Sequence, residues 1–266
     1  MEKITSKDNS SIKEVRKLKE KKHRTFNKKF LVEGFRFVEE AIKSNFYIEE
    51  LFIAEETLEK FYKYDFQYNI KEYTKIYSVE DKLFKTISNT ENPQGILAIA
   101  RYKDTETKAT DGFYILADRV QDPGNMGTII RSAHAAGALG VILTKGTVDV
   151  YNDKTLRSTM GSIFHIPIIE DTDLSITKTL QNNGFKILVS SLEESQDFYD
   201  INLNKNIIIC VGNEGSGISD EILKLSDEKF KIPMPGKAES LNVAVAASIM
   251  MFERVRQNLK KVDNSI

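Results

Sequence analysis

The residue types that carry redox and metal chemistry are scarce in this chain. Its 266 residues include one cysteine, Cys210, no tryptophan and only three histidines. A single cysteine excludes an internal disulfide framework and suits a reducing compartment. The histidines are scattered, at His23, His134 and His165, so the sequence predicts no metal site and no need for a metal ion.

Long apolar runs are also missing. No run approaches the roughly 18 apolar residues expected of a membrane span, and Met1–Lys7 holds no apolar signal core. We therefore expect a soluble, cytoplasmic protein with no membrane partner. Cys210 lies in the apolar run Ile207–Val211, which predicts a buried strand residue rather than a reactive thiol.

The net charge of −1 conceals an uneven distribution of charge. Residues 1–30 carry 11 lysines and arginines against 4 acidic residues, most of them between Lys13 and Lys29. Such a basic stripe can neutralise several phosphates of a nucleic acid without reading its sequence. The alternative interpretation is a solvated helix face without a ligand.

Two patterns of elements divide the chain. Up to Arg101 the elements predict a small α/β unit, which begins with an amphipathic helix carrying Ile12, Val15 and Leu18 every three residues. A polar stretch without periodicity follows over residues 102–110. We therefore predict two domains, 1–104 and 110–266.

The second domain alternates apolar strands with helices. The predicted strands are Phe113–Ala117, Gly140–Thr144, His165–Ile169, Phe185–Ser190, Asn206–Val211 and Lys229–Ile232. The predicted helices between them are Thr128–Ala136, Tyr151–Met160, Leu174–Asn183 and Asp220–Leu225, and the last helix is Ser240–Leu259. This alternation predicts an α/β fold with a mostly parallel sheet covered on both faces. The first half of the last helix is apolar nearly all round, which predicts burial in its own domain or against a second subunit.

Three glycine-bearing turns stand out because each follows a predicted strand. They are Asp122–Arg131, Val211–Gly217 and Ile232–Gly236, the last running on into Glu239–Val243. Loops at the carboxyl ends of parallel strands form the ligand crevice of such folds. We therefore expect the three turns to build one composite site.

The second turn indicates the class of ligand. Its spacing, G-x-x-G-x-G from Gly212 to Gly217, inverts the dinucleotide fingerprint, and Glu214 inside it would repel a pyrophosphate. The chain also lacks a G-x-x-x-x-G-K-[ST] phosphate loop. An adenosine-type ligand without a phosphate tail is predicted.

The other two turns supply candidate contacts. Ile232 and Leu241 can form apolar walls for a base, with Ser240 starting the last helix as its N-cap. Asp122–Asn125 reads as a turn, and the guanidinium of Arg131 suits the grip of an RNA phosphate. His134, in the same helix, is expected to pack or to face solvent.

These residues resemble the three motifs of the SpoU (TrmH-like) branch of the SPOUT RNA methyltransferases over residues 111–260. Asn125 and Arg131 match the first motif, Gly212–Gly215 the second and Ser240–Val243 the third. The resemblance implies transfer of a methyl group from S-adenosylmethionine (AdoMet) to a ribose 2′-oxygen of RNA. It also implies a deep trefoil knot, a homodimer formed through the C-terminal domain, and an N-terminal RNA substrate-binding domain of the L30e-like type.

The resemblance further implies roles for single residues. Arg131 becomes the catalytic residue; because arginine is always charged, we expect it to bind a phosphate and to stabilise the developing alkoxide. That phosphate or Glu214 would accept the proton, while Asn125, Ser240 and Asn242 orient the substrate and the loops. The expected cofactor contacts are Thr144, Gly212, Asn213, Gly217, Ile232 and Leu241.

The predicted function is therefore 2′-O-ribose methylation of RNA, with 23S rRNA favoured by the N-terminal domain. The open alternatives are a tRNA substrate, a base nitrogen as methyl acceptor, and a non-catalytic rRNA-binding module of the same fold. The intact polar residues of the motifs argue against the last. The nucleotide, and whether the role is housekeeping or antibiotic resistance, stay open.

Overall fold

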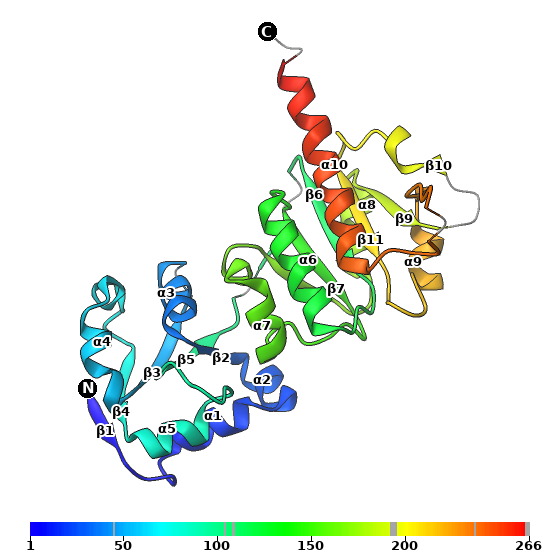
Figure 1. Ribbon diagram of the computed structural model, residues 1–266. Helices are drawn as coiled ribbons and strands as arrows, with labels where there is room; N and C mark the ends of the chain where they lie inside the picture. Colours follow the sequence, from blue (N-terminus) through cyan, green and yellow to red (C-terminus); the bar gives the residue numbers. More distant parts are fainter. Residues whose placement is uncertain (45, 104, 108–109, 192–195, 237, 264–266) are drawn as a thin grey trace. The chain divides into compact units, whose positions relative to one another are not determined.

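The protein folds into two compact units (Figure 1). The computed structural model describes residues 1–44, 46–103, 105–107, 110–191, 196–236 and 238–263, with the backbone alone for 260–263. The N-terminal unit consists of Met1–Asp104 and Tyr151–Phe164, and the C-terminal unit of Thr105–Val150 and His165–Ile266.

The segment Tyr151–Phe164 differs from the expectation, which placed its helix among the elements of the second domain. Helix α7 (Asp153–Thr159) and its flanks belong to the N-terminal unit. Aromatic rings hold the segment there: Tyr151 lies 4.6 Å from the ring of Phe30 and 4.0 Å from that of Tyr102. This burial joins residues far apart in the sequence, so no local pattern reveals it.

The N-terminal unit contains a mixed five-stranded sheet in the order β1-β4-β3-β5-β2. Its strands are β1 (Glu2–Ile4), β2 (Lys29–Glu33), β3 (Ile48–Ala54), β4 (Lys75–Val79) and β5 (Ile96–Arg101). Strand β5 runs antiparallel to β2 and β3, whereas β4 runs parallel to β1 and β3. The sequence did not indicate β1, a short strand with a single buried side chain.

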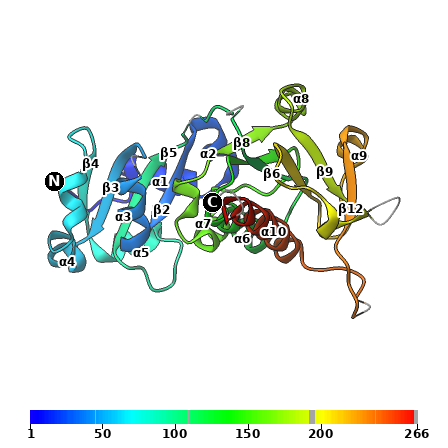
Figure 2. The same cartoon turned by 90° about the horizontal axis from the view of Figure 1, so that it is seen from above.

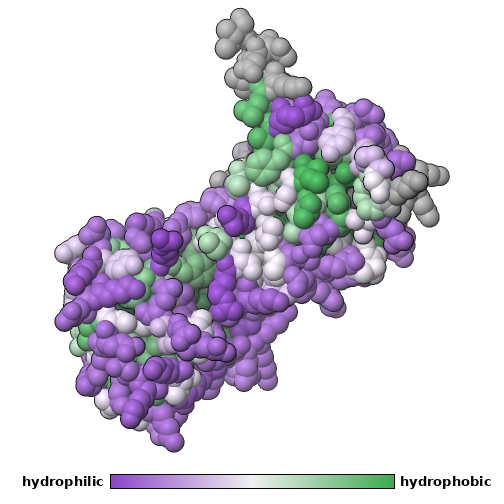
Figure 3. Space-filling model, in the orientation of Figure 1, coloured by the Kyte–Doolittle hydropathy of each residue, from purple (hydrophilic) through white to green (hydrophobic). Residues whose placement is uncertain are grey.

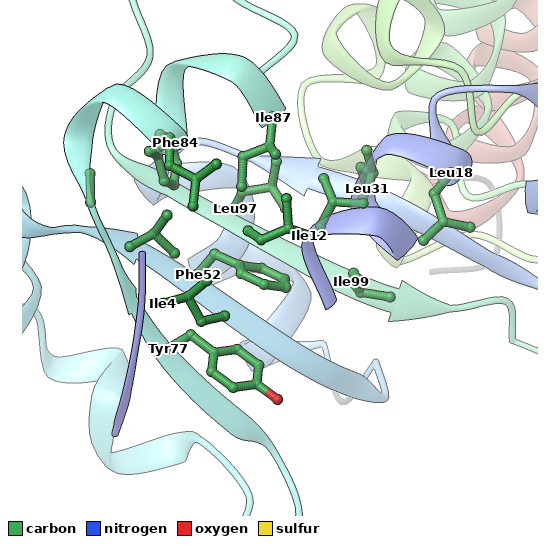
Figure 4. Packing of buried hydrophobic residues seen from close by; sticks show 14 residues of the cluster. Ile4, Ile12, Leu18, Leu31, Phe52, Tyr77, Phe84, Ile87, Leu97 and Ile99 are labelled. Carbon is green, nitrogen blue, oxygen red and sulfur yellow. The ribbon is translucent and has the colours of Figure 1, made fainter. Parts of the chain in front are cut away.

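Helices flank this sheet because each has one apolar side. They are α1 (Ser10–Leu18), α2 (Lys21–Asn27), α3 (Phe35–Lys43), α4 (Leu58–Tyr62) and α5 (Asp81–Ile87), with 3₁₀ turns η1 (Glu55–Thr57) and η2 (Asp65–Asn69). Ile12 of α1 and Phe84 of α5 lie near Phe52 and Leu97 of the sheet, and Leu18 lies near Leu31 of β2 in the same cluster (Figure 4). The expected amphipathic first helix is present with its apolar residues buried.

One carboxyl group is buried beneath α1. Glu50 is 5% exposed, and its Oε1 accepts a hydrogen bond of 3.2 Å from Ser11. No described residue bonds to its other oxygen. Burial raises the pKa of Glu50 above its ordinary value of 4.5. The stabilising contribution of the protonated carboxyl group is therefore complete below pH 4.5. The free energy of unfolding falls as the pH rises through the folded-state pKa and the group ionises.

We therefore expect Glu50→Gln to stabilise the protein at neutral pH by on the order of 1 kcal/mol, because the amide carries no charge to desolvate. Thermal unfolding of both proteins between pH 4 and pH 8 measures the effect. The melting temperature of the variant should exceed that of the wild type by a margin that grows with pH. A margin that is constant or shrinks with pH would contradict the account of Glu50.

The C-terminal unit contains a seven-stranded sheet in the order β10-β12-β9-β11-β6-β7-β8. The strands are β6 (Phe113–Ala117), β7 (Gly140–Thr144), β8 (Ile168–Asp171), β9 (Lys186–Ser190), β10 (Gln196–Asp197), β11 (Ile207–Val211) and β12 (Glu228–Lys231). Every pair of neighbours is parallel. The predicted α/β class with a mostly parallel sheet is confirmed, and Cys210 is buried in β11 as expected.

Helices cover both faces of this sheet. Helices α6 (Pro123–Ala135) and α10 (Val243–Asp263) lie on one face, and α8 (Ser175–Asn182) and α9 (Asp220–Leu225) on the other (Figure 2). Two further 3₁₀ turns are η3 (Ser162–Phe164), in the N-terminal unit, and η4 (Phe198–Asp200), in the C-terminal unit. Among the described helices, none combines the length and the apolar character needed to cross a membrane.

Two helices at the site begin elsewhere than expected. Asp122–Asn125 was expected as a turn, but α6 starts at Pro123: the Asp122 carboxylate caps it by accepting from the Asn125 N–H at 2.8 Å, and proline suits the first helical position. Ser240 was expected as the cap of the last helix, but α10 starts at Val243. Its cap is Asn242, whose Oδ1 accepts from the N–H of Ala244 at 2.9 Å.

Candidate active site

Three side chains tie the three turns together. Asn125, in the first turn of α6, donates from Nδ2 to Oε1 of Glu214 at 3.0 Å. Asn242, at the start of α10, donates from Nδ2 to Oδ1 of Asn125 at 2.9 Å. Residues 89 and 117 positions away from Asn125 thus meet at one point, the carboxyl edge of the parallel sheet. The turns converge as the sequence predicts.

Glu214 organises the first turn through its carboxylate. Its oxygens accept from the backbone N–H groups of Gln121 at 3.2 Å and Asp122 at 3.1 Å, in addition to Asn125. Partial burial alone would raise the pKa of Glu214, but the hydrogen bond from Asn125 and those from the backbone outweigh it, and the net effect lowers the pKa. A carboxylate that is stabilised in its charged form positions neighbours better than it accepts a proton.

The glycine turn after β11 is held by its own backbone. Asn213 and Gly217 exchange two N–H to C=O hydrogen bonds of 2.9 and 3.0 Å. The Asn213 Oδ1 accepts from the N–H groups of Gly215 and Ser216, and its Nδ2 donates to the carbonyl of Arg119. Asn213, predicted as a cofactor contact, therefore has a clear structural role in closing this turn.

Beneath the turns lies a buried carboxylate that the sequence reasoning missed. Asp118, 2% exposed at the end of β6, accepts from the Ser219 N–H at 2.6 Å and from the Thr144 hydroxyl at 2.9 Å. The same hydroxyl accepts from the N–H of Arg119. Thr144, another predicted cofactor contact, thus joins β7 to the loop after β6. Its position as a polar residue directly after the predicted strand Phe113–Ala117 could have indicated Asp118 as a site residue.

A pocket of about 290 Å³ opens between residues of the second and third turns. It is lined by Ser190, Ser191, Gly217, Lys231, Ile232, Met234, Glu239, Ser240, Leu241 and Ala246. Four of the predicted site residues, Gly217, Ile232, Ser240 and Leu241, lie in its wall. Of the predicted cofactor contacts, Thr144, Gly212 and Asn213 lie outside its lining, as do Asn125, Arg131, Glu214 and Asn242 of the predicted catalytic residues.

The pocket also contains residues that the sequence did not single out. Ser190 ends β9, the neighbour of β11, and Ser191 follows it, so both reach the same edge of the sheet. Their position at the carboxyl end of a predicted strand could have indicated them. Lys231 and Met234 lie in and after β12, beside the predicted Ile232, and only the fold shows that they face the pocket.

Arg131 lies in the middle of α6, on its exposed side. No described residue forms a hydrogen bond or an ion pair with its guanidinium. The neighbouring Ser132 faces α10 instead, with its hydroxyl 2.8 Å from that of Ser248. This guanidinium, six residues after Asn125 on the same helix, is available for an anionic ligand. His134 is exposed and stacks on the ring of His165 at 5.0 Å.

The described residues contain no group of three or more His, Cys, Asp or Glu side chains that could hold a metal ion.

Comparison with known proteins decides the family. The model of the SpoU rRNA Methylase family matches residues 112–252, which include all three turns, and the model of an MRM3-like substrate binding domain matches residues 9–98. The chain belongs to the SpoU rRNA methylase family. The family predicted from the three motifs is confirmed.

Relatives of this SpoU methylase match it along nearly its whole length. The 23S rRNA (guanosine(2553)-2'-O)-methyltransferase RlmP of Bacillus subtilis is 38% identical over 95% of this chain and 98% of its own. An AdoMet-bound rRNA methyltransferase from Sinorhizobium meliloti is 32% identical, with a TM-score of 0.85 over 96% of this chain and 97% of its own. AviRb from Streptomyces viridochromogenes, in complex with AdoMet, is 26% identical with a TM-score of 0.84 over 94% and 98%.

Proposed function

We propose that the chain transfers a methyl group from AdoMet to a ribose 2′-oxygen of 23S rRNA. The observation that carries this proposal is the hydrogen-bonded junction of Asn125, Glu214 and Asn242 beside a pocket of about 290 Å³. The similarity to RlmP, whose name specifies 23S rRNA and the 2′-O position, supports the choice of substrate and of acceptor atom.

The pocket fits an adenosyl ligand. Its volume is close to the lower end of small-molecule sites, and its wall combines apolar side chains such as Ile232, Met234 and Leu241 with hydroxyl groups. Two solved relatives carry AdoMet. In our proposal Ile232 and Leu241 hold the base, and Gly217, Ser190 and Ser191 supply polar contacts. When bound, AdoMet supplies an electrophilic methyl group with a good leaving group.

The proposed roles of the polar residues follow from their geometry. Arg131 binds a phosphate of the RNA and stabilises negative charge that develops on the 2′-oxygen, since a guanidinium stays charged at all physiological pH values. Asn125 and Asn242 hold the start of α6 against the start of α10, and Ser240 borders the pocket where the ribose would enter. The lowered pKa of Glu214 favours a positioning role over that of a base, so the proton leaves through the substrate phosphate to water.

The assembly is also a proposal. Apolar residues gather over α10 in Figure 3. On this helix Val245 is 48% and Phe252 49% exposed. A second copy covering these side chains would bury them, which fits the homodimer implied by the family resemblance. Light scattering coupled to size exclusion tests this state. The trefoil knot and the cytoplasmic location likewise remain proposals.

The substrate is tested by mapping ribose methylation in total rRNA and tRNA from a strain that lacks the gene. We expect one 2′-O-methyl mark to be missing from 23S rRNA, with the guanosine named for RlmP as the first position to inspect, and to return when the gene is restored. A missing tRNA mark would move the substrate to tRNA. A methyl group lost from a base, or no lost mark, would refute ribose methylation.

A further inference from the structure

A second pocket, of about 320 Å³, lies within the N-terminal unit. It is lined by Leu18, Lys19, Arg24, Leu31, Asn89, Tyr151, Asn152, Asp153 and Lys154. We call it the α1–α7 pocket, because its wall joins the end of α1 to the start of α7. Its volume suits a ligand of the size of one nucleotide, and none of its lining residues belongs to the three motif turns.

The lining is rich in positive charge. Arg24 is 6% exposed and donates from Nη1 to the carbonyls of Leu18 at 2.8 Å and Lys19 at 2.7 Å. Lys19 donates from Nζ to the carbonyl of Ser88 at 2.8 Å. Lys154 lines the pocket and is exposed, and no described residue bonds to its ammonium group. Three of the lining residues are cationic and one, Asp153, is acidic, so the charge of the lining favours an anionic ligand.

The lining also offers groups that could read a base. Asp153 is an acceptor, fixed by an ion pair of 2.5 Å with Arg157. Asn89 is exposed, and its backbone N–H is held at 2.8 Å by Glu33. An amide both donates and accepts, and a carboxylate accepts only. A plain phosphate site would have no use for the carboxylate, whereas the edge of a base requires donors and acceptors together.

An exposed aromatic ring stands close by in the sequence. Phe26, two residues after Arg24 on α2, is 85% exposed. It lies between Lys21–Lys22 and Lys28 in the basic stripe. Aromatic rings among cations are the usual platform for the bases of single-stranded RNA, because stacking tolerates any base while the cations hold the backbone.

We propose that the N-terminal unit binds single-stranded RNA by stacking one base on Phe26 and holding a second nucleotide in the α1–α7 pocket. This rests on the proposed function only in taking RNA as the substrate class. It assigns substrate recognition to unpaired nucleotides, and it separates the anchoring residues from the residues of the reaction.

The test uses the full-length protein and a labelled, mixed-sequence RNA of about a dozen nucleotides, within the range of single-strand sites. Fluorescence anisotropy compares this strand with its duplex across a series of salt concentrations. We expect Phe26→Ala to weaken single-strand binding about tenfold with no change in salt dependence, since a stacking contact is lost. Lys154→Ala should weaken it and lower the slope of log K against log salt by about one.

Matched controls come from the same unit. Tyr68 is 82% exposed, and Lys63 is an exposed lysine outside the pocket, so Tyr68→Ala and Lys63→Ala should bind like the wild type. Asn89→Trp places a large ring in the mouth of the pocket and should reduce binding with the melting temperature unchanged; Asn89→Ala serves if the larger ring perturbs folding. If Phe26→Ala and Lys154→Ala bind single-stranded RNA as tightly as their controls do, the proposal is overturned. Equal losses for duplex and single strand would also overturn it, since they would indicate a general polyanion surface.

AdoMet binding separates this proposal from the proposed function. Calorimetry with AdoMet reports on the C-terminal unit, and we expect all of these variants to bind AdoMet like the wild type. If methyl transfer is never observed but the RNA losses occur, only the proposed function fails. If methyl transfer proceeds and Phe26→Ala leaves both RNA binding and the KM for RNA unchanged, only this inference fails.

Discussion

Arg131→Ala is expected to reduce methyl transfer by about 10²–10³-fold, the usual loss when a group that stabilises developing charge is removed. The affinity for AdoMet should change little, because Arg131 is outside the lining of the pocket that holds Ile232 and Leu241. Stability should also be preserved, since the side chain is exposed and no described residue bonds to its guanidinium. Transfer of radiolabelled methyl groups to 23S rRNA from the strain lacking the gene, with calorimetry for AdoMet, measures both effects.

Two further variants define what the guanidinium does. Arg131→Lys keeps the charge but loses the planar fork, so partial activity is expected if the role is phosphate binding. Lys178→Ala removes an exposed cation from α8 of the same unit and should leave activity unchanged. A large loss of AdoMet affinity in Arg131→Ala would instead give this residue a structural role. Unchanged activity would remove it from the reaction.

The second large effect is expected at Gly212, directly after β11. A Cβ there would lie 2.3 Å from the backbone carbon of Gly217 and 2.5 Å from its oxygen. Backbone atoms cannot move aside as a side chain can, so Gly212→Ala must open the paired turn between Asn213 and Gly217. We expect a loss of stability of about 3 kcal/mol and a loss of AdoMet affinity of at least about tenfold, because Gly217 lines the pocket and Glu214 lies in the same turn.

The same turn provides the control. A Cβ on Gly215 would meet only the Oδ1 of Asn213, at an ordinary 3.6 Å. Gly215→Ala should therefore change stability by less than about 0.5 kcal/mol. Urea unfolding and AdoMet calorimetry on both variants make the comparison. If the two substitutions behave alike, the close approach of Gly212 to Gly217 does not decide the stability of the turn.

The sequence predicted the centre of the parallel sheet well because β6, β7 and β11 are buried along their whole length. Phe113–Ala117 and Gly140–Thr144 were placed with the bounds that the structure shows, since an apolar run between turn residues leaves little choice. The helix starts were harder. Asp-Pro and Ser both cap helices and open turns, so the sequence alone could not decide between Ser240 and Asn242, or recognise Asp122 as a cap.

The candidate site was predictable in position but less so in the roles of its residues. Three turns at the carboxyl edge of one sheet had to meet, and Asn125, Glu214 and Asn242 do. Which amide bonds to which carbonyl depends on distances that only the folded chain sets. Gly212 was expected to admit a ligand, whereas its nearest neighbour is the backbone of Gly217. The α1–α7 pocket could not be predicted from the sequence, because its lining brings Tyr151–Lys154 next to the end of α1.

The packing of Tyr151–Phe164 into the N-terminal unit has a consequence for evolution and for protein engineering. The polypeptide passes between the two units three times: after Asp104, after Val150 and after Phe164. A recombination event at the polar linker alone would therefore transplant an incomplete module, without the aromatic residues that pack on Phe30 and without part of the wall of the α1–α7 pocket. Exchange of substrate preference between relatives must carry both pieces of the N-terminal unit, so the two halves of this enzyme are expected to evolve as a linked pair.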